Sequence, residues 1–116
     1  MVSIKKRALK DLQKLFNGLL KWSVKTNTKN NVRENHMSRE HVKDYCDKIL
    51  DVCYELDSKV YHAPARYFDH RRYGKYVYNY TPSNKRTNIY IIYDINKHGV
   101  ILINKITTNY KTISGF

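Results

Sequence analysis

Apolar residues recur at steps of three and four from residue 7 to residue 25, the spacing of one apolar stripe on a helix. Residues 1–4, directly before this helix, are compatible with a short strand. The chain is therefore expected to open with a short strand and an amphipathic helix. The apolar stripe consists of Ala8, Leu9, Leu12, Leu15, Phe16, Leu19 and Leu20, and the other face carries Lys10, Lys14, Lys21 and Lys25.

A second helical pattern follows a polar stretch. Residues 26–37 are rich in Asn and lack an apolar period, which predicts a loop. Ser38 is then a candidate N-cap, and Glu40 in the first turn suits the positive end of the helix dipole. Apolar spacing from Val42 to Leu56 carries this helix to about Ser58. The two helices, over residues 5–59, are expected to form an antiparallel hairpin.

The last third of the chain changes to a period of two, which is typical of strands. Residues 75–81, 87–94 and 100–107 are rich in β-branched and aromatic side chains, and Pro, Asn and Gly separate the runs. They predict a three-stranded antiparallel meander over about residues 75–110. Strict alternation puts Ile103 and Ile106 on opposite faces of its last strand. The expected fold is a single α+β domain of residues 1–116.

One face of this sheet must be core against the helices, and the other is open to water or a partner. Tyr76, Tyr78 and Tyr80 share a face, and packing under the helices is favoured over an RNA-stacking ladder. Lys105 interrupts an apolar strand, where a charge is costly unless it faces outward or is paired. We therefore expect Lys105 to mark the open face.

The net charge of the chain indicates what kind of partner it binds. The net charge of +12 and the pI near 9.7 indicate an acidic partner, either nucleic acid, an anionic membrane surface or an acidic protein. Residues 1–37 and 61–116 each carry a net charge of +7, whereas residues 38–60 carry −2. No apolar run reaches transmembrane length and no export signal follows the basic start, so a cytoplasmic protein without a membrane partner is expected.

The candidate chemistry is basic and aromatic. Residues 70–73 (HRRY) predict either a phosphate clamp with a stacking tyrosine or a solvated loop, and His62 and His98 are expected to be solvated at turns. Cys46 and Cys53 lie seven residues apart on one predicted helix, roughly 10 Å, which is too far for a disulfide. They indicate reduced core cysteines, and the sequence has no zinc set, Ser/His/Asp set, paired carboxylates or Gly-rich phosphate loop. No metal or cofactor is expected.

The order β-α-α-β-β-β resembles the RelE/ParE superfamily of type II toxins. The segments that carry the resemblance are residues 76–80 (YVYNY), 88–94 (NIYIIYD) and 100–106 (VILINKI), together with residues 6–12 (KRALKDL) in the first helix. The resemblance spans most of the chain as a pattern of elements. Tyr90 stands where the family carries an arginine, and Asn109 or Tyr110 stands at its closing histidine.

The resemblance implies a toxin neutralised by a cognate antitoxin. RelE-like members enter the ribosome and cut mRNA without a metal, since the 2′-hydroxyl is an internal nucleophile. ParE-like members inhibit DNA gyrase and cut nothing; an inactive RNA-binding relative is a third reading. For a metal-independent endoribonuclease, the implied catalytic residues are Lys105, Tyr110, Lys111 and Lys75. The implied RNA-binding residues are His70, Arg71, Arg72, Arg86 and Tyr90.

Overall fold

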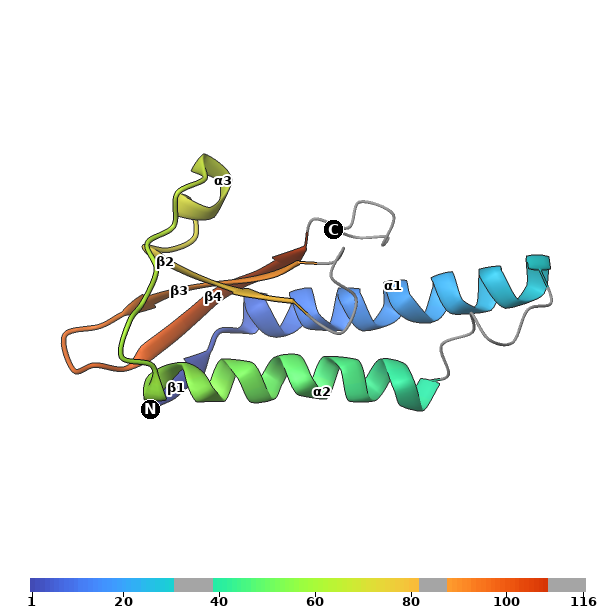
Figure 1. Cartoon of the computed structure of the whole chain (residues 1–116), viewed down its shortest axis with the longest axis horizontal. Helices are drawn as coiled ribbons and strands as arrows, with labels where there is room; N and C mark the ends of the chain where they lie inside the picture. The colour runs from blue at the N-terminus through green and yellow to red at the C-terminus, as the bar shows by residue number, and fades with distance from the viewer. Residues whose placement is uncertain (31–38, 82–87, 109–116) are drawn as a thin grey trace.

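The structure, a computed structural model, describes residues 1–30, 39–81 and 88–108, with residues 21–30 and 39 described as backbone alone. A mixed sheet lies between a pair of long helices and one short helical turn (Figure 1). In chain order the elements are β1 (Val2–Ile4), α1 (Lys6–Asn30), α2 (Arg39–Glu55), η1 (Leu56–Ser58), α3 (Phe68–Arg71), β2 (Tyr76–Tyr80), β3 (Ile89–Ile95) and β4 (Ile101–Thr108).

The sheet has the strand order β1-β4-β3-β2. β2 pairs with β3 and β3 with β4 in antiparallel fashion, as the sequence predicts. β1 is parallel to β4, with Val2 opposite Ile101, so the sheet is mixed and four-stranded rather than a three-stranded antiparallel meander. A parallel partner requires a long crossover, and the two helices between β1 and β2 provide it. A strand of three residues gives no sequence signal of its partner.

The two long helices cover one face of the sheet and bury their apolar stripes against it (Figure 1). Tyr76, Tyr78 and Tyr80 pack against the same core from β2, which confirms the packing interpretation of these tyrosines. Cys46 and Cys53 are buried in α2 as free thiols, also as expected. The strand side chains at the centre of the core are Ile89, Ile91, Tyr93, Ile101, Ile103 and Ile106.

A β-bulge in β4 sets which side chains face the core. Lys105 lies opposite Ile92 and Ile103 lies opposite Tyr93, so Asn104 is an extra residue on β4. The prediction that Ile103 and Ile106 lie on opposite faces is therefore wrong, because the extra residue turns both toward the helices. The outer face of the sheet carries two cross-strand rows, Asn79–Tyr90–Thr107 and Val77–Ile92–Lys105.

Backbone hydrogen bonds extend the sheet beyond its named strands on both sides. Past the end of β1, the Lys5 N–H donates to the Ile103 carbonyl at 3.0 Å, which continues the pairing of this segment with β4. On the other side, segment 63–65 runs beside β2, where the Ala65 N–H donates to the Lys75 carbonyl at 2.8 Å. The start of β2 is thereby protected from pairing with another chain.

The helices differ from the expected boundaries in one respect. α1 continues to Asn30, so residues 26–30 are helical and not part of a loop. An apolar period reports burial, and a helix that runs beyond its core loses the period while its backbone continues. The end of α2 at Glu55, followed by the 3₁₀ turn to Ser58, agrees with the prediction. Ser38, the predicted N-cap, lies outside the described residues.

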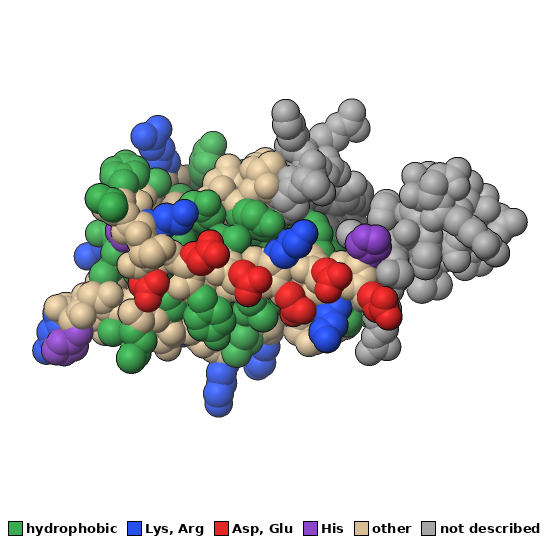
Figure 2. Space-filling model, turned by 60° about the horizontal axis from the view of Figure 1, so that its bottom comes forward, with side chains coloured by type: hydrophobic (Ala, Val, Ile, Leu, Met, Phe, Trp, Pro, Cys, Tyr) green, Lys and Arg blue, Asp and Glu red, His purple; other side chains and the backbone are tan. Residues whose placement is uncertain are grey.

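The solvent-facing side of α2 carries a stripe of carboxylates (Figure 2). Their spacing of three and four residues places them on one side of the helix. The ion pairs Met1–Asp57 and Lys105–Asp11 involve none of them. We call this set the acidic stripe: Glu40, Asp44, Asp47, Asp51 and Glu55.

Among the described residues, no helix is long and apolar enough to cross a membrane.

Candidate nucleic-acid interface

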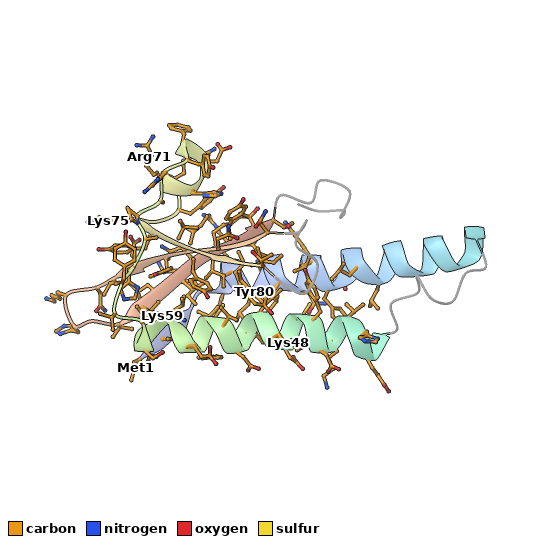
Figure 3. All side chains as sticks on the ribbon, in the orientation of Figure 1. Met1, Lys48, Lys59, Arg71, Lys75 and Tyr80 are labelled. Atoms are coloured by element: carbon orange, nitrogen blue, oxygen red, sulfur yellow. The ribbon has the colours of Figure 1, made fainter. Side chains whose placement is uncertain are left out.

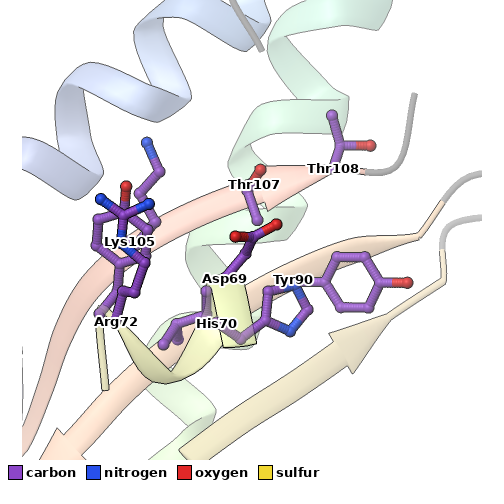
Figure 4. A pocket seen from close by; sticks show the side chains of 9 residues that line it. Asp69, His70, Arg72, Tyr90, Lys105, Thr107 and Thr108 are labelled. Atoms are coloured by element: carbon purple, nitrogen blue, oxygen red, sulfur yellow. The ribbon is translucent and has the colours of Figure 1, made fainter. Parts of the chain in front are cut away.

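A groove of about 390 Å³ lies on the outer face of the sheet, between α3 and strands β3 and β4 (Figure 4). α3 positions His70 over Tyr90, while Arg72 follows α3 and Lys105 rises from β4. We call this space the cationic groove. It is lined by Asp69, His70, Arg72, Tyr73, Tyr90, Ile92, Lys105, Thr107 and Thr108.

His70 is held in this groove by aromatic rings. Its imidazole lies 4.7 Å from the Tyr90 ring and 5.3 Å from the Tyr67 ring, between centroids. Its Nδ1 atom is buried and finds no hydrogen-bond partner among the described residues. Burial lowers the pKa of His70, and the neighbouring Asp69 carboxylate opposes part of that shift. Burial therefore favours the neutral imidazole of His70, the form that accepts a proton.

Lys105 is paired rather than free. Its Nζ donates to Asp11 Oδ1 at 2.9 Å, and Asp11 Oδ2 accepts the Ile106 N–H at 3.1 Å. The Lys105 side chain is 23% exposed and that of Asp11 is 5% exposed. Lys105 does stand in an outer-face row, as expected, but its ion pair with α1 offsets much of its charge. The pair also satisfies the backbone N–H that follows the bulge.

Tyr73 gathers three cations around one ring. The Arg7 and Arg72 guanidinium carbons lie 5.7 Å and 5.9 Å from its centroid, and Lys105 Nζ lies 5.4 Å away. Cations at such distances are attracted to the negative face of the ring. The same ring thus collects positive charge from α1, from the loop after α3 and from β4 at one end of the groove.

The loop that carries Tyr73 is tied to the bulge. Asn104 Nδ2 donates to the Tyr73 carbonyl at 2.6 Å and to Asp94 Oδ2 at 2.9 Å. Asp94 Oδ1 accepts the Lys75 N–H at 2.9 Å. Gly74 lies so close to β3 that a Cβ atom would stand 2.7 Å from the Tyr93 carbonyl oxygen. The bulge therefore fixes both Lys105 and the Tyr73 loop.

The structure brings together four of the nine residues named from the sequence. His70, Arg72, Tyr90 and Lys105 line the cationic groove. Arg71 and Lys75 lie on the α3 side of the molecule but do not line the groove (Figure 3). The other three, Arg86, Tyr110 and Lys111, lie outside the described residues.

Sequence reasoning missed Asp11 and the environment of His62. Asp11 is the single acid before Glu34, and an isolated acid on a basic helix was a usable signal.

His62 is half-buried, and its Nδ1 lies 2.7 Å from the Tyr93 hydroxyl, so the prediction that His62 is solvated is wrong. Burial raises the pKa of that hydroxyl to about 12, with a further contribution from Tyr76. No pattern along the chain places residue 62 beside residue 93.

Among the described residues, no three His, Cys, Asp or Glu side chains gather as a metal site would require. Comparison of the chain with protein-family models, with curated proteins and with solved structures found no match.

Proposed function

We propose that this chain is a RelE/ParE-like toxin of a type II toxin–antitoxin module, and that it acts as a ribosome-dependent mRNA endonuclease. The observation that carries the proposal is the cationic groove, where the exposed Arg72 stands beside His70, whose pKa is lowered by burial. A basic protein with a cationic groove suits a phosphate backbone. The partners implied are mRNA on the ribosome and a cognate antitoxin.

The groove residues suit cleavage that uses the 2′-hydroxyl of RNA as nucleophile. His70 takes the proton of that hydroxyl, and the oxygen attacks the adjoining phosphorus. Arg72 stabilises the extra negative charge on the phosphate oxygens. The bond from phosphorus to the 5′-oxygen breaks, leaving a 2′,3′-cyclic phosphate and a 5′-hydroxyl, whose proton comes from a general acid. Tyr110 and Lys111 remain the predicted candidates for that acid.

The ion pair of Lys105 favours a second candidate function. Asp11 binds the Lys105 side chain and also accepts the Ile106 N–H after the bulge, so Lys105 has a structural role. If that role is its only one, β4 offers no free cation to an RNA phosphate. The chain would then be a ParE-like protein that binds and inhibits DNA gyrase without cutting RNA. An inactive RNA-binding relative would share the groove but would not arrest growth.

Inducible expression of the chain without neighbouring genes separates these functions. Growth arrest with new mRNA 5′ ends inside translated frames, mapped minutes after induction, is the expected result. His70→Gln and Arg72→Ala should each reduce cleavage about 100-fold or more, since a general base or a charge-stabilising group contributes at least that much. Lys48→Ala is the matched control, because Lys48 is an exposed cation on α2, away from the groove (Figure 3).

The alternatives give different results in the same cells. Arrest with intact mRNA and a DNA-damage response would replace the nuclease by the gyrase inhibitor. Normal growth, although the protein is expressed, would indicate an RNA-binding relative that is not toxic. Full cleavage by the His70→Gln and Arg72→Ala variants would remove the cationic groove as the site.

A further inference from the structure

A second groove, of about 380 Å³, adjoins the cationic groove on the outer face of the sheet. His70 and Tyr90 line both grooves, so their ring pair forms the wall between them. The lining is different on the two sides of that wall. The polar lining of the cationic groove is Arg72, Lys105, Asp69 and two threonines, whereas the second groove is mainly aromatic.

The aromatic rings come from segment 61–67 and from the sheet. Tyr61 and Tyr67 are 74% and 67% exposed, although each is a large side chain that could be buried. Tyr67 also lies edge-on to the His70 ring at 5.3 Å between centroids. Exposed tyrosines around a groove present flat faces to a ligand, and every nucleobase has a face that stacks on such a ring.

Two polar side chains complete the lining of this groove. Asn79 is exposed on β2, in the outer-face row of Tyr90, and its carboxamide can both donate and accept hydrogen bonds. Arg66 adds planar donors from the segment before α3. Such groups are suited to the polar edge of a base, whereas a purely apolar ligand would leave them without partners.

Charge around the two grooves points to a polyanion. Residues 61–75 hold four Lys/Arg and one acid, Asp69. Arg66, Arg71 and Arg72 are all exposed. A stacking groove beside a cationic groove, with one ring pair between them, matches a base joined to its own phosphate.

We propose that the second groove binds an unpaired nucleobase of single-stranded RNA while the adjoining phosphate lies in the cationic groove. The inference rests on the proposed function, because it assigns RNA to the same face. Tyr67 and Tyr61 stack on the base, and Asn79 contacts its edge. A paired base in an A-form duplex cannot offer its face to these rings, so the substrate is single-stranded.

Fluorescence anisotropy at low salt tests this with the full chain and a labelled ten-residue 2′-O-methyl RNA, which lacks the free nucleophile. The comparison probes are the same oligomer with abasic residues and its duplex. The intact single strand should bind about five to 150 times more tightly than the abasic one, the range for one base–aromatic stack. Tyr67→Ala should abolish that difference, and Tyr67→Phe should keep it.

Tyr54→Ala is the matched control, since Tyr54 is 57% exposed on α2 and does not line the groove. Tyr61→Ala provides a second test in a solvent-exposed ring, where loss of folding is not expected. Equal affinity for intact and abasic strands, with Arg72→Ala weakening both, would overturn the base groove and leave the phosphate site standing. Absence of binding to every oligomer would also overturn this inference, and mRNA 5′-end mapping would then decide the proposed function separately.

Discussion

Asp11 joins two parts of the molecule that lie 94 residues apart in the chain. Its carboxylate accepts hydrogen bonds from the Lys105 amine and from the Ile106 backbone, and only 4% of the residue is exposed. Hydrogen bonds sheltered from water are stronger, and an unmade one is more costly. A single acid on α1 therefore stabilises the bulge that positions the cationic groove.

Removing this carboxylate should destabilise the protein. Asp11→Ala leaves the Ile106 N–H and the Lys105 amine without their acceptor, and we expect a loss of about 1–3 kcal/mol in the free energy of unfolding. Asp11→Asn keeps an acceptor for the N–H and should lose less. Urea denaturation measures both variants. An Asp11→Ala protein as stable as the wild type would mean that water replaces the carboxylate.

The two thiols predict a loss of stability in alkali. Burial raises the pKa of both Cys46 and Cys53 from 9.0 to about 12 in the folded chain, with Asp47 adding to the shift of Cys46. The contribution of these neutral thiols to the free energy of unfolding is therefore present below about pH 9, and it is lost as the pH rises toward 12. Native protein at pH 8 should react slowly with a thiol reagent and rapidly once unfolded. A Cys46→Ala/Cys53→Ala variant should show a weaker loss above pH 9; an unchanged loss would assign it to other groups.

At the scale of elements, the sequence predicted where the strands and the two long helices lie, but not the short helix α3, the parallel pairing of β1 or the bulge that shapes the site. The three C-terminal strands agree with the observed bounds to within two residues. The bulge at Asn104 was not predictable, because period-two alternation in β4 is regular along the chain and only the partner strand reveals the extra residue. The end of α1 was missed for a related reason, since burial and not helix formation set the apolar period.

Two glycines give a matched test of the turns beside β2 and before β4. Gly74→Ala should cost about 1–3 kcal/mol, because its Cβ would stand 2.7 Å from the Tyr93 carbonyl oxygen, a backbone atom that cannot move alone. Gly99→Ala meets no atom within 4 Å, and its φ of +79° should cost roughly 1–2 kcal/mol.

Substitution by Asn separates the steric clash at Gly74 from the effect of the positive φ at Gly99. Asn tolerates positive φ, so Gly99→Asn should be milder than Gly99→Ala, while Gly74→Asn should be no better than Gly74→Ala. Thermal unfolding of the four variants checks the pattern. Equal effects of Ala and Asn at Gly99 would contradict the conformational explanation.

At the scale of the molecule, hydrophobic pattern was enough for an α+β fold with helices on one face of the sheet. It was not enough for the site, because the outer face depends on which residues α3 and the bulge bring together. His70 and Arg72 were named from a local basic run, and Lys105 from a charge in an apolar strand. Their meeting with Tyr73, and the capture of Lys105 by Asp11, depend on contacts between distant segments.

The acidic stripe of α2 gives the molecule two electrically distinct sides. The short extents of the molecule are 26 and 25 Å, whereas salt at physiological strength screens charges over about 8 Å. The carboxylates therefore cannot neutralise the arginines on the α3 side, and each side acts on its own surroundings. The acidic stripe repels a polyanion from α2 (Figure 2), whereas the exposed arginines at residues 66, 71 and 72 attract it to the outer face of the sheet. The protein is thus oriented toward the polyanion before the two make contact. The α2 side then stays free to bind a basic surface.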